Sequence, residues 1–318
     1  RAAKPLLHMT FSHPPMRLQR RVYGHLPDGR AVDELTLSHG GLTLSLITLG
    51  GIVTMLWAPD RHGVAANVVR GFDNLADYAQ RNPHFGVIVG RYANRIALGD
   101  LVIDGQAHAL SRNDGSNCLH GGTQGFGKRL WEIVSTREHD AALDGPAVTL
   151  RYASADGEEG FPGRVEALVT YSLGPERTWR VDYEATTDRP TVVNLSHHDY
   201  FNLAGRGNAL DQVLTLPASR YNPVDADLIP TGVADVAGTP FDFRAPMPIR
   251  ARLGDAHPQL ALAGGYDHNW ILDDAATGTL RLAARLEDPA SGRAMELRTP
   301  EPALKFTSSP FLAGPLMR

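Results

Sequence analysis

The chain has 318 residues, of which 42% are hydrophobic and 21% are charged, and its formal net charge is -4. These fractions are close to those of ordinary globular proteins, so they exclude an intrinsically disordered chain, and the charge excludes a strongly basic surface for nucleic acid. The 32 glycines and 22 prolines exceed the usual share, while only 7% of the residues are aromatic, which favours many turns and an all-β fold.

The start of the chain predicts no regular element. Residues 1–19 mix Arg, Lys, His and Pro, and we interpret them as a leader, a tag or an extension outside the fold. No apolar run approaches the roughly 18–20 residues of a membrane helix, so we expect no membrane segment. The single cysteine, Cys118, cannot form a disulfide within the chain, which favours a cytoplasmic location.

From Glu34 onward, short runs alternate apolar and polar residues with a period of two, which is typical of β-strands. The predicted strands lie at residues 35–38, 42–49, 51–57, 101–104, 147–152, 165–173, 179–185, 191–195, 213–216 and 280–286. One short helix is expected at residues 74–80. No linker separates two compositions, so we expect residues 20–318 to form a single domain, either a β-sandwich or a large barrel.

Four polar segments flanked by glycine lie in loops or at strand ends, at residues 90–96, 117–122, 194–205 and 264–270. They place histidines beside Asn, Asp, Arg and aromatic residues. Loops that are positioned by a rigid sheet are where binding and catalytic residues concentrate, so we expect these segments to converge on one site.

Two chemistries suit these residues. The imidazoles of His120, His197, His198 and His268 are potential ligands of zinc or iron. Alternatively, they act as general acids and bases while Asn, Arg and Asp bind the hydroxyls of a polyol. Adjacent residues of a strand point to opposite faces, so His197 and His198 cannot both be ligands in an extended segment, and acid–base chemistry is favoured.

The chain resembles the aldose 1-epimerase family, the galactose mutarotases, across roughly residues 20–314. Matching segments include Gly90-Arg-Tyr-Ala-Asn-Arg-Ile96, Leu119-His-Gly-Gly122, the stretch from Asn194 to Gly205, and Gly265-Tyr-Asp-His-Asn269. The resemblance implies a large antiparallel β-sandwich with very little helix. It also implies an enzyme that interconverts the α and β anomers of a free aldohexose, its small-molecule partner. Neither a metal nor a redox cofactor is expected, because both steps are proton transfers.

The resemblance implies a role for each of two histidines. His198 matches the general acid, which protonates the ring oxygen so that the pyranose opens. His120, in Leu119-His-Gly-Gly122, matches the second histidine, which binds and polarises near the same oxygen. His197 fits a structural role.

Four further residues match substrate-binding positions of the family. Asn94 and Arg95 match positions that bind sugar hydroxyls, and Asp267 matches the carboxylate that accepts hydrogen bonds from them. Glu301, in Thr-Pro-Glu-Pro, falls where family members place a polar side chain beside the sugar.

One element of the family is not found in the 318 residues. The general base of the family is a glutamate in a G-x-x-L-E-x-Q segment, which follows the strand that is predicted here at residues 304–312. We therefore expect either that the chain is incomplete or that the site is repurposed, with Glu301 as the best substitute base. Two alternatives stay open. One is a non-catalytic sugar-binding or sensor protein, and the other is a hexose-phosphate epimerase that uses Arg91 or Arg129.

Overall fold

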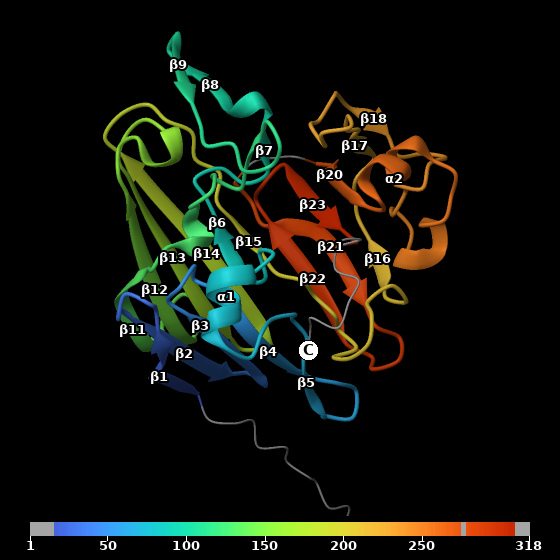
Figure 1. Cartoon of the computed structure of the whole chain (residues 1–318). Helices are drawn as coiled ribbons and strands as arrows, with labels where there is room; N and C mark the ends of the chain where they lie inside the picture. Colours follow the sequence, from blue (N-terminus) through green and yellow to red (C-terminus); the bar gives the residue numbers. More distant parts are fainter. Residues whose placement is uncertain (1–15, 275–277, 309–318) are drawn as a thin grey trace, which may run out of the picture.

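The computed structural model describes residues 16–274 and 278–308, and strands are its main regular element (Figure 1). The first five strands form one antiparallel sheet in chain order: β1 (Arg17–His25), β2 (Ala31–His39), β3 (Leu42–Ile47), β4 (Val53–Pro59) and β5 (Ala65–Asn67). Gly40 and Gly41 join β2 to β3 with φ values of 58° and 88°, which a two-residue turn of this kind requires. Because β1 begins at Arg17, residues 17–19 belong to the sheet and not to the predicted extension.

The second large sheet is also an antiparallel meander, made of β11 (Glu132–Asp140), β12 (Gly145–Ser154), β13 (Val165–Gly174) and β14 (Thr178–Thr187). It packs against the first sheet through alternate residues of each strand. Leu35 and Leu37 of β2 and Val148 and Val169 of the second sheet belong to one hydrophobic cluster and are fully buried. The period-two alternation seen in the sequence therefore marks the two inner faces of a sandwich.

The C-terminal part adds two four-stranded sheets, drawn in yellow to red in Figure 1. One has the order β19 (Met247–Pro248), β16 (Val213–Thr215), β21 (Arg281–Glu287) and β22 (Ala294–Thr299). The other has the order β18 (Ala234–Asp235), β17 (Arg220–Asn222), β20 (Asp267–Ile271) and β23 (Ala303–Thr307). The cluster that fills the N-terminal sandwich continues into these sheets through Trp270 and Leu286. The predicted all-β sandwich is confirmed.

Three two-stranded ladders complete the described strands: β6 (Val87–Val89) with β15 (Ser196–His198), β7 (Arg95–Ile96) with β10 (Cys118–Leu119), and β8 (Asp100–Ile103) with β9 (Gln106–Ala109). The hairpin of β8 and β9 projects at the top of Figure 1. The described residues contain two α-helices, α1 (Leu75–Arg81) and α2 (Pro258–Ala263). The predicted helix at 74–80 is confirmed as α1, which begins after Asn74 because its side chain accepts a hydrogen bond from the amide of Asp77 at 3.0 Å.

One predicted strand is wrong. Residues 191–195 form no strand, although three of them are apolar, and only Asn194 makes an isolated bridge to Tyr92. Its amide donates to the carbonyl of Arg91, and its carbonyl accepts from the amide of Ala93. The segment thus fastens the 90–96 loop to the start of β15, which brings two of the polar segments together.

Candidate functional site

Three histidine rings meet beside the ladder of β6 and β15. The ring centroids of His120 and His198 are 5.2 Å apart, and His84 lies 4.7 Å from His120 and 5.7 Å from His198. His84 follows α1, His120 follows β10 and His198 ends β15. The expected convergence of the 117–122 and 194–205 segments is therefore present, and His84, which the sequence did not single out, joins them.

The pairing of β15 with β6 separates the two adjacent histidines. His198 lies opposite Val87, and its ring stacks on Tyr200 with centroids 5.0 Å apart. His197 points the other way, where its Nδ1 bonds to Asp199 at 2.5 Å and its Nε2 lies 3.1 Å from the hydroxyl of Tyr171. The side chain of His197 is only 8% exposed, so it fastens the strand to the sandwich core.

His120 is fixed by a reciprocal pair of hydrogen bonds with Asn94. The amide of Asn94 donates to Nδ1 of His120, and the amide of His120 donates to the carbonyl of Asn94, both at 3.0 Å. Because Nδ1 accepts, neutral His120 carries its proton on Nε2. Gly121 must follow, since a Cβ at this position would lie 1.8 Å from the carbonyl oxygen of Gly90.

Arg95 borders the same site from β7. Its Nε donates to Oδ2 of Asp114 at 2.7 Å, and its Nη1 lies 3.4 Å from Oδ1 of Asn94. The side chain is 10% exposed, so the guanidinium is held in one direction and not free in solvent. Asn94 and Arg95 therefore present an amide and a cation beside His120.

The remaining part of the site comes from β20 and β23. Along β20, His268 and Trp270 are buried while Asp267 and Asn269 are partly exposed, so the accessible face of this strand is polar. Lys305 of β23 reaches along this face, and its Nζ lies 3.0 Å from Oδ1 of Asp267. The sequence analysis missed Lys305, although its alternation with Leu304 and Phe306 places it on the face opposite to theirs.

Burial lowers the pKa of all three histidines, but the neighbouring groups that shift each pKa further are different. Burial, and then the charges of His198 and Lys128, lower the pKa of His84 to about 4. Burial, and then His84, His198 and two cations, hold the pKa of His120 well below its usual value. Burial also lowers the pKa of His198, but a hydrogen bond to its own carbonyl and the carboxylates of Asp199 and Asp267 act in the opposite direction. Of the three, His198 is the ring best placed to carry a proton.

These pKa values make the fold sensitive to acid. His84 titrates near 6.5 when unfolded and near 4 when folded, so the unfolded chain binds more protons between these values. We expect the contribution of neutral His84 to the free energy of unfolding to be fully present above pH 6.5. This contribution should be lost as the pH falls towards 4. Urea unfolding at pH 7.0, 6.0 and 5.0 (each ~0.1 M salt) measures the slope.

The variant His84→Asn tests the source of that slope, because asparagine tolerates the positive φ of 73° at this position but does not titrate. We expect a flatter dependence on pH in this variant and an unchanged one in His62→Asn, whose histidine is exposed. Equal slopes in the two variants would contradict the assignment.

Glu301 and Asp267 lie near opposite ends of β23. Glu301 lies in the turn between β22 and β23, next to the end of β23 that pairs with Ile271, while Asp267 lies opposite Thr307 at the other end. Four residues of strand separate these two ends by roughly 13 Å. The expectation that Glu301 binds the sugar or serves as a substitute base stays a prediction, and its separation from Asp267 does not favour it.

We expect Glu301→Gln to leave the kcat of the expected anomer interconversion within about twofold of the parent, because the end of β23 next to Glu301 lies roughly 13 Å from the end that faces Asp267. Polarimetry of freshly dissolved α-D-galactose measures this rate. Glu296→Gln, on the neighbouring strand β22, is the matched control. A tenfold loss that is confined to Glu301→Gln would restore its predicted role.

The two arginines that a phosphate site would need are engaged elsewhere. Arg91 is 2% exposed and donates to Oγ of Ser154 and to the carbonyls of Ala155 and Pro162. Arg129 lies beside Glu158, with Nε 3.5 Å from Oε1. These contacts fasten the loop after β12 to the rest of the fold, and they do not favour the hexose-phosphate alternative.

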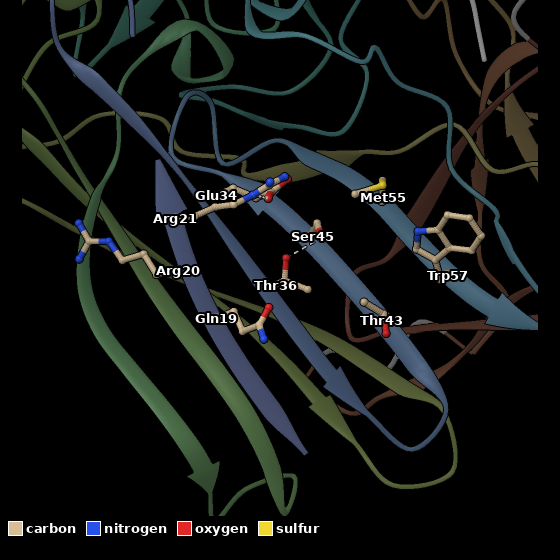
Figure 2. A pocket seen from close by; sticks show the side chains of 9 residues that line it. All are labelled: Gln19, Arg20, Arg21, Glu34, Thr36, Thr43, Ser45, Met55 and Trp57. Atoms are coloured by element: carbon tan, nitrogen blue, oxygen red, sulfur yellow. Dashed lines mark hydrogen bonds and ion pairs between the residues drawn. The ribbon is translucent and has the colours of Figure 1, made fainter. Parts of the chain in front are cut away.

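A separate shallow depression of about 550 Å³ lies on the outer face of the first sheet (Figure 2). Its side chains bond to one another: the hydroxyls of Thr36 and Ser45 are 2.9 Å apart, and Arg21 pairs with Glu34. None of the site residues predicted from the sequence lines this depression, which consists of Gln19, Arg20, Arg21, Glu34, Thr36, Thr43, Ser45, Met55 and Trp57. This depression is therefore separate from the segments at which the site is expected.

Two features are absent from the part of the chain that the structure describes, residues 16–274 and 278–308. In this part of the chain, no helix is long and apolar enough to cross a membrane. Within the same ranges, no group of three or more His, Cys, Asp or Glu side chains is arranged to hold a metal ion. His268, one of the four histidines considered as ligands, is fully buried, with its Nε2 3.0 Å from Oε1 of Gln259.

Comparison with known proteins gives a consistent result. The family model described as aldose 1-epimerase matches residues 33–317. The chain is 40% identical over 304 residues to the galactose mutarotase of Sus scrofa. The aligned residues cover 93% of this chain and 83% of that protein. This chain is 34% identical over 291 residues to the aldose 1-epimerase of Escherichia coli, which covers 91% and 82%.

A solved structure is similar over most of the fold. The galactose 1-epimerase of Lactobacillus acidophilus superposes with a TM-score of 0.75 at 29% identity, covering 86% of this chain and 78% of that chain. The GalM/aldose epimerase homologue of C. elegans superposes with a TM-score of 0.72 at 28% identity, covering 81% and 75%.

Proposed function

This chain belongs to the aldose 1-epimerase family, and we propose that His198, His120, Asn94, Arg95 and Asp267 form its active site. The protein is an enzyme that interconverts the anomers of aldoses. One observation supports this assignment of residues above the others. The rings of His120 and His198 lie 5.2 Å apart, and the carboxylate of Asp267 raises the pKa of His198.

We assign the acid step to His198. In its protonated form, His198 donates a proton to the ring oxygen of the pyranose while a base removes the proton of the anomeric hydroxyl. The bond between C1 and the ring oxygen breaks, and C1 becomes the carbonyl carbon of the open aldehyde. Rotation about C1–C2 and the reverse proton transfers close the ring on the other face. Asp199 and Asp267 favour the protonated form of His198, because they raise its pKa against the effect of burial.

His120 acts as a neutral donor in this proposal. Its Nδ1 is engaged by the amide of Asn94, so the proton on Nε2 is available for a hydrogen bond to the same ring oxygen. A neutral imidazole polarises this oxygen without competing for the proton that His198 carries. Burial and the neighbouring cations maintain this state, because both lower the pKa of His120.

Asn94, Arg95 and Asp267 bind the hydroxyls. Asn94, directly before β7, and Arg95, in β7, supply donors, and Asp267 supplies an acceptor from β20. A hydroxyl both donates and accepts, so facing donors and acceptors orient the sugar through several hydrogen bonds. Such positioning is worth several orders of magnitude in rate, because it places the reacting atoms before the proton moves.

We further propose a single mutarotase-like domain that works in the cytoplasm and binds no nucleic acid. The shared hydrophobic cluster of the N- and C-terminal sheets supports one domain. The net charge of -4 supports the absence of a nucleic-acid partner, and the lone, buried Cys118 supports a reducing compartment.

The decisive experiment is polarimetry of the purified protein with freshly dissolved α-D-galactose and α-D-glucose. An approach to anomeric equilibrium that is faster than in buffer and proportional to protein concentration supports the proposal. Sugar binding by calorimetry without acceleration would instead support the non-catalytic sugar-binding alternative.

A further inference from the structure

Lys305 is held against Asp267 by two contacts from one ammonium group. Its Nζ lies 3.0 Å from Oδ1 of Asp267 and donates to the backbone carbonyl of the same residue at 2.9 Å. The register of the strands explains the reach, since Lys305 lies opposite Asn269 and Thr307 lies opposite Asp267. Lys305 therefore spans two residues of β20, and the two bonds limit the rotation of the Asp267 side chain.

This ammonium group is partly removed from water. Burial lowers the pKa of Lys305, while the charge and the hydrogen bond of Asp267 raise it. Its side chain is 32% exposed and that of Asp267 is 14% exposed. The carboxylate of Asp267 stabilises the charged form of this partly buried lysine, and the ammonium group in turn holds the carboxylate in one orientation.

The charges around the two catalytic histidines are unequal. His84, His198, Arg95 and Lys305 all oppose a positive charge on His120. His198 faces the carboxylates of Asp199 and Asp267, and among its principal neighbours only His197 opposes its charge. Lys305, which opposes a charge on His120, and Asp267, which favours one on His198, are partners in one ion pair, and the two rings are only 5.2 Å apart.

We propose that Lys305 is a positioning residue of the active site: it orients Asp267 and, with Arg95, directs the proton to His198 and away from His120. This inference rests on the proposed function, because it assigns the origin of the different roles of the two histidines. Lys305 transfers no proton itself. It acts through the carboxylate that it holds and through the field of its charge, which is strong in a partly buried site.

The test compares Lys305→Met, which removes the charge, with Lys305→Arg, which retains it. The proton state of His120 is read by NMR of the imidazole Cε1–H groups between pH 8 and pH 5, with the signal assigned through His120→Gln. We expect the His120 signal to stay unprotonated over this range in the parent and in Lys305→Arg. In Lys305→Met, the signal should begin to move towards the protonated form at a higher pH.

Lys128→Met is the matched control. Lys128 is the other described lysine, and its charge acts on His84, while its ammonium donates to the carbonyl of Thr123 at 2.8 Å. We expect this variant to leave the His120 signal unchanged. If Lys305→Met does not fold, Lys305→Gln replaces it, since the amide retains a donor of similar length but no charge.

Polarimetry of the same variants gives a second measurement. Loss of the bond that orients Asp267 should raise KM for galactose by about 10-fold or more in Lys305→Met, the range of a charge-assisted hydrogen bond. An unchanged His120 signal in Lys305→Met, or an equal shift in Lys128→Met, would overturn the inference. The NMR result does not depend on turnover, so a parent protein without mutarotase activity would refute the proposed function and not the charge assignment.

Discussion

Replacing His198 with asparagine should lower the kcat of mutarotation by about 10²- to 10⁴-fold, the range that one general acid contributes. Asparagine keeps a side chain that can hydrogen-bond to the sugar, but it cannot deliver a proton to the ring oxygen. We therefore expect KM for galactose to change much less than kcat, because the proton moves in the transition state and not in the bound ground state. Polarimetry over a range of galactose concentrations measures both constants.

His62→Asn is the control for this prediction, since His62 is exposed and lies in a turn outside the site. It should behave as the parent does. Far-UV circular dichroism of both variants excludes a folding defect. An identical kcat in the parent and in His198→Asn would contradict the role of His198 as the acid, whatever the effect on binding.

Replacing Arg91 with methionine should lower the free energy of unfolding by about 2–4 kcal/mol. The buried guanidinium bonds to Oγ of Ser154 and to the carbonyls of Ala155 and Pro162 at 2.7–3.0 Å, and methionine can satisfy none of these acceptors. Each buried acceptor without a donor costs roughly 1–3 kcal/mol, and the relief from burying a charge offsets part of the sum.

Urea unfolding monitored by tryptophan fluorescence measures this loss. Arg180→Met is the control, because Arg180 is an exposed arginine that pairs with Asp182 on the surface, where such substitutions change stability by about 0.5 kcal/mol or less. A difference of less than about 1 kcal/mol between the two variants would show that the loop after β12 does not depend on Arg91.

The parts of the fold that the sequence predicted well are the long strands of the sandwich. β13 pairs with β14 over its whole length and buries alternate residues from Val165 to Tyr171, so the period of two persists and the pattern is unambiguous. The segment 191–195 fails for the opposite reason. Its apolar residues are as frequent as in a strand, but the backbone of Asn194 bonds to the loop at Arg91 and Ala93 instead of a neighbouring strand.

The residues of the candidate site also fall into those that the sequence predicts and those that it does not. His120, His198 and Asp267 could be predicted because they lie in recognisable segments with glycine nearby. His84 could not, because a positive φ after α1 turns its ring towards residues far away in the sequence. Lys305 was not predicted either, although it is the residue of β23 whose side chain contacts Asp267. Register between strands is a tertiary property, and a single strand does not encode it locally.

The proposed active site draws His120 and His198 from residues before 199 and Asp267 and Lys305 from the last third of the chain, where β20 and β23 pair. A bound aldose therefore touches both parts and acts as a removable cross-link between them. Because such a ligand binds only the assembled protein, sugar stabilises the docked arrangement by an amount that rises with the logarithm of its concentration once the site is mostly occupied. The metabolite that the enzyme turns over is, for as long as it is bound, also one of the contacts that hold the two parts of the sandwich together.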